Sequence, residues 1–281
     1  MRLVPGLLLY GTCLVAASLA SGCGGDSGGG GDTPDAMVEP SADADPGMPS
    51  PPDAAPRMLG NCETGVTAPA GSFLPADIGN SWRYRVTDSL GEVTTKSQEY
   101  TELLTASDEI GEVIVQVTMK ADGVTENWLK RDGDAVLRIR QRDFDALGVL
   151  ERTTCYVPSR TRIDESPERL VEGAQWTDNY VRQVIPGTIE QNVICKADGS
   201  AIDCDPAGIT STCETVQDQW TVLATDVPCK TDFGELSCVQ IQRLRLIGGN
   251  APPKIYWFAR GYGKIREEGE QLEELIGCEF E

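Results

Sequence analysis

The chain has 281 residues and a formal net charge of −20, with 24 basic and 44 acidic side chains and no histidine. A surface this acidic repels the phosphate backbone of nucleic acids, so we predict no nucleic-acid partner. The lack of histidine excludes sites that use it as a catalytic base or a zinc ligand, and we predict neither a cofactor nor an enzymatic activity.

The N-terminal segment has the pattern of an export signal. Arg2 is the only charge before position 26, and residues 3–20 are apolar and end in small residues. This apolar run is barely long enough to cross a membrane, and no basic stop signal follows it. We therefore favour a signal peptide, residues 1–22, over a transmembrane anchor.

The five residues that end this segment, "LASGC" at 19–23, resemble the lipobox of bacterial lipoproteins. The resemblance implies that Cys23 becomes the mature N-terminus and carries the acyl chains that anchor the protein in a membrane. Ala20 stands where that family prefers leucine, so an ordinary cut after Ala20 is the alternative. Gly24, which follows the cysteine in place of aspartate, implies delivery to the outer membrane, facing either the periplasm or the surface.

The number of cysteines agrees with lipid attachment at Cys23. Removing Cys13 with the signal and Cys23 by lipidation leaves an even set that can form about four disulfides in an oxidising compartment: Cys62, Cys155, Cys195, Cys204, Cys213, Cys229, Cys238 and Cys278. Two pairings suggest themselves. Cys229 and Cys238 flank a hairpin-like turn, and Cys62 and Cys278 lie at the two ends of the folded domain.

The mature chain divides into a tether and a domain. Residues 23–58 comprise the lipidated cysteine and a stretch rich in Gly, Pro and Asp, which cannot build a core and is predicted to be disordered. Residues 59–281 form a single domain in which apolar and polar residues alternate in short runs: 82–86, 112–120, 124–131, 135–142, 176–185, 215–225, 237–247 and 254–260.

This pattern predicts a mainly β fold, namely an antiparallel curved sheet, a half-barrel or a sandwich. The turn signals at 121–123 and 132–134 indicate a meander of hairpins. Short helices are expected at 164–171 and 268–276, although the second segment could equally be a final strand.

Two motifs, "GNSWRYRV" at 79–86 and "YWFARGYG" at 256–263, resemble segments of uncharacterised exported β proteins. The resemblance implies a curved antiparallel sheet or half-barrel, as in lipoprotein carriers, and assigns no activity. The alternating aromatic residues Trp82, Tyr84, Tyr256 and Phe258 are expected first as core and second as the wall of a ligand pocket.

Three other patterns could carry a site. Asp203, Asp205 and Glu214 have the spacing of a calcium loop, but Ala207 occupies a ligand position and no helices flank the loop, so we predict no metal site. The remaining candidates are two sets of arginines, each expected on one strand face, that could bind an anion or pair with the acidic surface: Arg138, Arg140 and Arg142, and Arg243 and Arg245. The acidic run at 267–274 is expected to be a solvated face.

The sequence thus favours a lipid-anchored envelope lipoprotein whose β domain binds a protein partner or an apolar ligand. One alternative is a structural surface or envelope lipoprotein without a small-molecule pocket. The other is a carboxylate-dependent polysaccharide hydrolase, which requires two partly buried acids facing each other across an open cleft.

Overall fold

The computed structural model describes residues 60–62, 71–107, 110–187 and 211–280. The chain divides into two units, Met1–Asp53 and Ala54–Glu281, and every described residue belongs to the second. The predicted signal peptide, Cys23 and the whole of the predicted tether lie outside the described residues.

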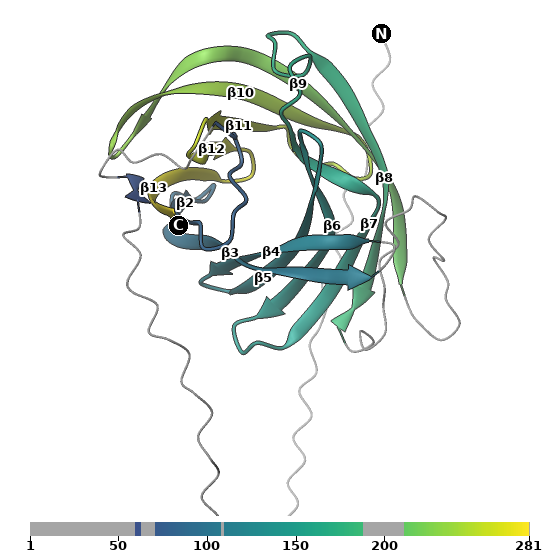
Figure 1. The fold of residues 1–281 in the computed structure, drawn as a ribbon. Helices are drawn as coiled ribbons and strands as arrows, with labels where there is room; N and C mark the ends of the chain where they lie inside the picture. The colour runs from purple at the N-terminus through teal and green to yellow at the C-terminus, as the bar shows by residue number, and fades with distance from the viewer. Residues whose placement is uncertain (1–59, 63–70, 108–109, 188–210, 281) are drawn as a thin grey trace, which may run out of the picture. The chain divides into compact units, whose positions relative to one another are not determined.

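The described residues form one antiparallel sheet (Figure 1). Its strands, in chain order, are β1 (Gly60–Asn61), β2 (Ser81–Thr87), β3 (Val93–Ser107), β4 (Gly111–Lys120), β5 (Gly123–Asp132), β6 (Ala135–Asp145), β7 (Leu150–Asp164), β8 (Gln175–Pro186), β9 (Thr212–Thr231), β10 (Gly234–Ile247), β11 (Lys254–Ala259), β12 (Gly263–Glu268) and β13 (Leu272–Phe280).

The sheet is a meander that closes on itself. Each strand from β2 to β13 pairs with its neighbours in sequence, and β13 pairs with both β12 and β2, with Leu275 opposite Tyr84. The two-residue β1 adds to the end of β13, with Gly60 opposite Phe280. The fold is therefore a closed barrel of twelve strands, and the half-barrel and the sandwich were wrong because the last long strand bonds to the first.

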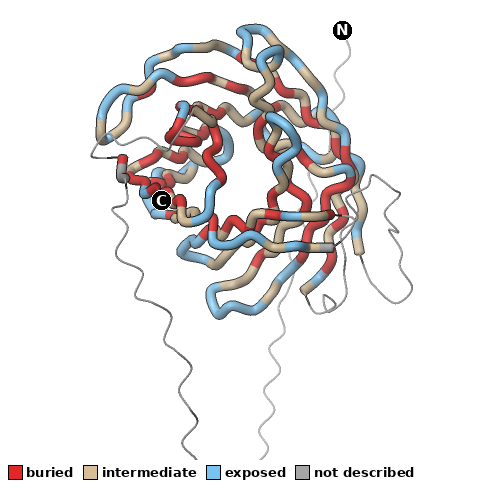
Figure 2. The backbone as a smooth tube through the Cα atoms, viewed as in Figure 1, coloured by how far each residue is buried: buried red, intermediate tan, exposed pale blue. Residues whose placement is uncertain are grey.

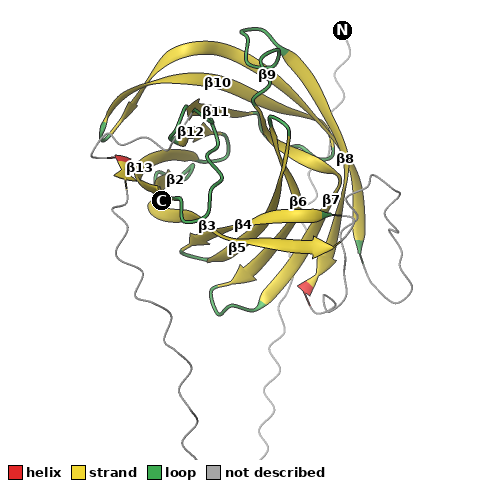
Figure 3. Cartoon of the chain, viewed as in Figure 1, coloured by secondary structure: helices red, strands yellow, loops and turns green. Residues whose placement is uncertain are grey.

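Seven of the eight predicted strand runs lie within strands, and the run 254–260 passes the end of β11 by one residue. The helix predicted at 164–171 does not exist, and the segment 268–276 takes its alternative, a final strand. Residues 165–174 form turns and bends, and residues 272–276 belong to β13. Strands β3, β7 and β12 were not predicted; β3 reads VTTKSQEYTELLTAS, a polar sequence without regular alternation. No α-helix occurs in the described ranges, and the two short red segments in Figure 3 are single-residue 3₁₀ pieces at Cys62 and Gly187. No helix in these ranges is long and apolar enough to span a membrane.

The connections between strands define two ends of the barrel. We call one end the mouth; it carries the turns at 88–92, 121–122, 146–149, 248–253 and 269–271. We call the opposite end the closed end; it carries the connections at 133–134, 165–174, 232–233 and 260–262. Buried residues occur in strands all around the ring (Figure 2).

Residues 71–80 cover the closed end before the chain enters β2. The Glu165 carboxylate accepts hydrogen bonds from the backbone N–H groups of Phe73 and Leu74, at 3.0 and 3.1 Å, and from the Ser72 hydroxyl at 2.7 Å. The N–H of Gly261 donates to the Ser72 carbonyl at 2.8 Å. These bonds hold the buried side chains of Phe73 and Leu74 against the main hydrophobic core.

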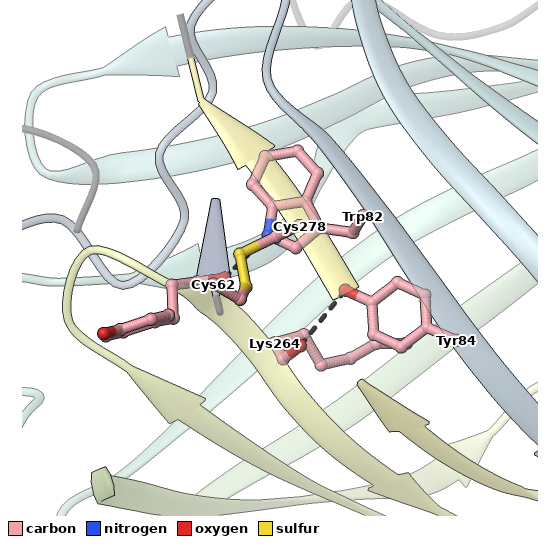
Figure 4. Close-up of a disulfide and its surroundings, with 6 residues drawn as sticks. Cys62, Trp82, Tyr84, Lys264 and Cys278 are labelled. Carbon is pink, nitrogen blue, oxygen red and sulfur yellow. Dashed lines mark hydrogen bonds between the residues drawn. A yellow bond between two sulfur atoms is a disulfide. The ribbon is translucent and has the colours of Figure 1, made fainter. Parts of the chain in front are cut away.

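Two disulfides, of the about four that were predicted, are seen with both cysteines within the described residues. Cys62–Cys278 joins the start of the described chain to β13 (Figure 4), and Cys229–Cys238 joins β9 to β10. These are the two pairings that the positions of the cysteines suggested. Cys155 and Cys213 are also disulfide-bonded, whereas Cys195 and Cys204 lie outside the described residues.

Candidate functional site

The four aromatic residues singled out in the sequence meet inside the barrel. Trp82, Tyr84, Tyr256 and Phe258 all line one enclosed cavity of about 20 Å³. A cavity of this size holds about one water molecule and no organic ligand. In this aromatic layer, Trp82, Tyr84 and Phe258 are therefore packed core, whereas Tyr256 also lines the larger cavity towards the mouth.

Local contacts hold this layer in place. The Trp82 ring packs edge-on against Tyr100, with ring centroids 5.3 Å apart, and its Nε1–H donates to the Tyr262 carbonyl at 2.6 Å. The Tyr84 hydroxyl donates to the Lys264 carbonyl at 3.1 Å (Figure 4). Gly263 allows this close approach, because a Cβ at Gly263 would lie 3.2 Å from Trp82 Nε1.

Towards the mouth the interior changes from apolar to charged. A cavity of about 240 Å³, which we call the cationic lumen, is lined by side chains from β3–β7 and β10–β13. Gln271, in the β12–β13 turn, and the exposed Lys120 are part of its wall, so the cavity opens at the mouth. Eight of the lining residues are cationic and only two are acidic: Lys96, Lys120, Arg138, Arg160, Arg162, Arg243, Lys254 and Lys264, against Glu267 and Glu273.

The two acidic residues are already engaged by lysines. Lys264 Nζ lies 2.6 Å from both Glu267 Oε2 and Glu273 Oε2, Lys254 Nζ lies 2.7 Å from Glu267 Oε1, and Lys96 forms an ion pair with Glu273. Lys96, Lys264, Glu267 and Glu273 are all buried. When all five groups are charged, this chain of ion pairs contains three ammonium groups and two carboxylates and has a net positive charge.

The protonation of these groups follows from burial and from the neighbouring charges. Burial, aided by the charge of Lys264, lowers the pKa of Lys96 to about 7. Burial alone would raise the pKa of Glu267, but the ammonium groups of Lys264 and Lys254 outweigh it and hold that pKa well below its usual range. For Lys264 the two carboxylates outweigh burial and raise the pKa.

Arginines form the other wall of the cationic lumen. Arg138, Arg160 and Arg243 are each only 8% exposed. Behind them lies Asp218, which is fully buried, with its Oδ2 3.6 Å from Arg160 Nε and 3.9 Å from Arg243 Nε. These distances exceed ordinary hydrogen bonds, so one carboxylate only partly neutralises two guanidinium groups.

The positive charge of Arg138 is compensated even less than those of Arg160 and Arg243. Its Nη1 donates to Gln141 Oε1 at 2.7 Å, and within the described residues neither Arg138 nor Arg162 forms an ion pair. The Nε atoms of Arg138 and Arg160 are buried without a hydrogen-bond acceptor in that part of the chain. Burial, with the charge of Arg162 beside it, lowers the pKa of Arg138 to about 10, which leaves the guanidinium charged at neutral pH.

The expected face shared by Arg138, Arg140 and Arg142 does not exist. The pairing of β6 with β7 shifts between Arg138 and Arg140, and the bulge turns the strand. Arg138 lines the cationic lumen, whereas Arg140 and Arg142 stack on Trp128 and Phe144 at 4.6 and 5.0 Å. The sequence could not show this reversal, because a bulge adds one residue without a distinctive motif.

Arg243 and Arg245 do share a face, since both approach the buried Asp218, with Arg245 Nε 3.1 Å from Oδ1. Their partner is an interior carboxylate and not the acidic surface that was expected.

The acidic run at 267–274 was also misjudged as a solvated face. Glu267 and Glu273 point into the cationic lumen, while Glu268 and Glu274 approach Arg266 and belong to the other face of their strands. Strand alternation splits the run, with β12 and β13 each contributing one inward acid.

Glu267 and Glu273 do not form the pair that a glycoside hydrolase needs. A general acid requires a raised pKa, whereas the lysines lower the pKa of both carboxyl groups. Lys264 also bridges them, with its Nζ 2.6 Å from an oxygen of each carboxylate.

The calcium candidate gains no support. Asp203 and Asp205 lie outside the described residues, and Glu214 is in β9, where it pairs with Arg182. No cluster of possible metal ligands occurs in the ranges that the structure describes.

A second hollow, of about 500 Å³, lies at the closed end. It is bounded by Phe73, Leu170 of the β7–β8 connection, and Leu236 and Val239 of β10. Asp226 and Arg260 are its charged lining residues. We call it the closed-end groove.

Most residues of the cationic lumen were missed in the sequence. Lys96, Arg160, Lys254 and Lys264 are single charges within otherwise ordinary strands, and nothing local marks them. One sequence signal was available. These cations are an even number of residues from a buried aromatic residue of the same strand and therefore share its inward face, as Lys254 does with Tyr256.

Fold and site together define a closed antiparallel barrel whose interior is apolar at one end and cationic at the other.

No protein-family model and no curated protein matches the chain. Two crystal structures are similar to it. One is a proposed exported protein with a YmcC-like fold from Bacteroides fragilis, with 12% identity, a TM-score of 0.39, and coverage of 75% of this chain and 97% of that one. The other is a proposed lipoprotein from Parabacteroides distasonis, with 10% identity, a TM-score of 0.38 and the same coverage.

Proposed function

We propose that this chain is an outer-membrane lipoprotein, anchored through Cys23, whose barrel binds an acidic ligand in the cationic lumen without transforming it. The observation that carries the binding function is the cavity with eight cationic and two acidic lining residues in a chain of net charge −20. Buried charges are costly unless they are compensated, and the two carboxylates of the lining compensate only some of them. An anionic ligand would supply the negative charge that compensates the other cations.

The kind of anion follows from the type of cation and its neighbours. Guanidinium groups present planar pairs of donors that match carboxylate, sulfate or phosphate. Neutral amide and hydroxyl groups share the wall and suit a ligand that also carries hydroxyl groups: Gln98, Thr118, Thr125, Asn127, Gln141 and Gln271. A volume of about 240 Å³ admits a small ligand or one residue of a chain. An acidic sugar residue has this combination of charge, hydroxyl groups and size.

Calorimetric titration with glucuronate, and with uncharged glucose as the control ligand, tests the binding. We expect heat of binding for glucuronate only. Arg138→Gln and Arg243→Gln should each lower the affinity by roughly tenfold, because a hydrogen bond to a charged group contributes about 1.5 kcal/mol or more. Arg142→Gln is the matched control, since Arg142 lies on β6 but stacks on Phe144 outside the cavity. Equal binding of glucose, or equal losses in all three variants, contradicts an anion site in the lumen.

The lipid anchor has a separate test. The intact mass of the mature protein should show Cys23 as the first residue with a diacylglyceryl group and an amide-linked acyl chain, and these chains should hold it in the membrane. An unmodified chain that begins at Ser21 rules out the anchor and leaves the binding proposal untouched.

A second candidate function is binding of an apolar ligand or an envelope protein in the closed-end groove. The observation in favour is its volume of about 500 Å³ and the apolar side chains of Phe73, Leu170, Leu236 and Val239 in its wall. The uncharged probe N-phenyl-1-naphthylamine should become fluorescent with the wild type and not with Leu236→Ser. Fluorescence that is unchanged in Leu236→Ser removes this candidate.

A further inference from the structure

The rim of the mouth carries an unusual number of exposed apolar side chains. Most of the exposed large hydrophobic residues in the described ranges lie in the mouth turns or at the strand ends beside them: Leu90, Val93, Met119, Leu147, Val149, Leu246 and Ile247. Single exposed apolar residues are ordinary on a protein surface, but their concentration on one rim marks an interaction site.

Two of the mouth turns are built alike. The β2–β3 turn reads Asp-Ser-Leu-Gly-Glu from Asp88, and the β6–β7 turn reads Asp-Ala-Leu-Gly-Val from Asp145. In each turn the aspartate Oδ1 accepts hydrogen bonds from the N–H groups two and four residues later, at 2.8 to 2.9 Å. The glycine has a φ of 82° in the first turn and 79° in the second, a region that favours glycine.

This construction presents a leucine at the tip of each turn. Leu90 is 84% exposed and Leu147 is 88% exposed. Tight turns are normally formed by polar residues, Gly and Pro, and neither leucine contributes its side chain to the turn. Since the same five-residue arrangement places a leucine outward twice at the same end of the barrel, the side chains serve contacts outside this fold.

The turns are also suited to an apolar medium. In each turn four backbone N–H groups donate hydrogen bonds within the turn itself, to the aspartate carboxylate or to backbone carbonyls. Unsatisfied backbone groups are what makes burying a loop in lipid costly. These tips therefore lose few hydrogen bonds with water when they are buried.

We propose that the mouth docks on a lipid surface, with Leu90 and Leu147 inserted among the acyl chains and the cationic lumen facing the headgroups. The apolar residues stand on separate turns around a ring, which a fluid lipid layer can accept without matching pockets. The cations that line the lumen beneath them are complementary to anionic headgroups, which favours a membrane that contains anionic lipid. This proposal rests on the rim and holds whether or not a soluble acidic sugar binds in the lumen.

Vesicle co-sedimentation tests the docking. The protein is the mature chain from residue 23 with Cys23→Ser, made without its signal segment so that no acyl chain or signal inserts. We expect it to sediment with vesicles of phosphatidylcholine plus phosphatidylglycerol more than with phosphatidylcholine alone. Leu90→Ser and Leu147→Ser should each lower the partition coefficient by roughly tenfold, and the double variant by roughly a hundredfold.

The matched control is Leu103→Ser, because Leu103 is also exposed, at 54%, but lies in the half of β3 that runs to the closed end. It should sediment like the wild type, and all variants should keep the wild-type Tm. The docking proposal predicts that the double leucine variant still binds glucuronate, and that Arg138→Gln still sediments with phosphatidylcholine vesicles. Failure of glucuronate binding alone therefore leaves the docking proposal standing.

Two results overturn the proposal. One is a double variant that sediments as well as the wild type. The other is a wild type that ignores both kinds of vesicle. If light scattering then shows that the wild type is a dimer and the double variant is a monomer, the rim is an interface between copies of this chain instead.

Discussion

The closed half and the mouth half of the barrel interior are built by the same strands and have opposite chemistry. On β10, Val239 and Ile241 belong to the hydrophobic core, and two residues later Arg243 lines the cationic lumen. On β11 the same change separates Phe258 from Lys254. The cavity within the aromatic core is only about 20 Å³, whereas the cationic lumen is about 240 Å³.

This division separates the residues that stabilise the fold from those that the proposed binding function would use. Burying aromatic and aliphatic side chains stabilises the fold in proportion to the area removed from water. Burying ion pairs is close to neutral at best, because desolvation offsets their attraction. We conclude that the closed half holds the barrel together, and that the mouth half retains its charges for another purpose.

The sharpest test of the closed half is Trp82→Ala. Trp82 is 3% exposed and contacts Tyr100 and Phe280 edge-on, so its removal leaves a large cavity. We expect a loss of about 4 kcal/mol in the free energy of unfolding, measured by urea denaturation. Trp257→Ala is the control, because Trp257 is only partly buried and stacks on Arg266. Equal losses in the two variants would mean that the closed half is not the main source of stability.

In the mouth half the largest effect is expected from Lys264→Met. The substitution leaves Glu267 and Glu273 buried with weaker compensation, which should cost about 3 kcal/mol at pH 7. In the wild type, carboxylates with lowered pKa stabilise the fold above their unfolded pKa, and this contribution is lost as the pH falls. In the variant the carboxylates protonate more readily.

The difference between Lys264→Met and the wild type should therefore shrink below about pH 4. Urea denaturation at several pH values measures it, with Lys120→Met at the exposed rim as the control. A difference that stays constant down to pH 3 would contradict the assigned pairing.

The smallest expected effect is a pH dependence of ligand binding in the mouth half, which we assign to Lys96. Burial lowers the pKa of Lys96 to about 7, so the lumen loses a positive charge as the pH rises through neutrality. The groups that face it are Lys264, Glu267, Glu273 and Tyr84, none of which titrates in that range, and the chain has no histidine. Glucuronate should bind a few-fold more tightly at pH 6 than at pH 8, and Lys96→Gln should remove this dependence. A dependence that persists in Lys96→Gln would assign the proton to another group.

Much of the fold was within reach of the sequence, because alternation and turn residues are local. The pattern WRYRV predicted β2, and the turns at 121–122 and 133–134 predicted the hairpins on either side of β5. The segments that were not predicted correctly are those whose local sequence has no clear alternation or fits a helix and a strand equally well. Strand β3 is polar, and the acid-rich segment from Glu268 reads as a helix or a strand until β12 and β2 pair with it.

The candidate site was much less accessible. Arg138 and Arg243 were considered, but as parts of strand faces, and the lysines of the lumen were not considered. Side chains along a strand alternate between the inside and the outside of the barrel. A charged residue therefore faces inward when it is an even number of residues from another inward residue, and each bulge between the two changes that number by one. The shift between Arg138 and Arg140 is enough to place neighbouring arginines on opposite sides of the barrel wall.

The sequence by itself determined the β class and the order of the hairpins, since each rests on residues close together in the chain. The export signal and the tether, which lie outside the described residues, stay predictions. Only the tertiary structure decided that the sheet closes, because the bonds between β13 and β2 join segments from opposite ends of the domain. Closure then directed inward-facing charges from eight strands toward one cavity. A convergence of single residues so far apart in sequence leaves no local pattern from which it could have been predicted.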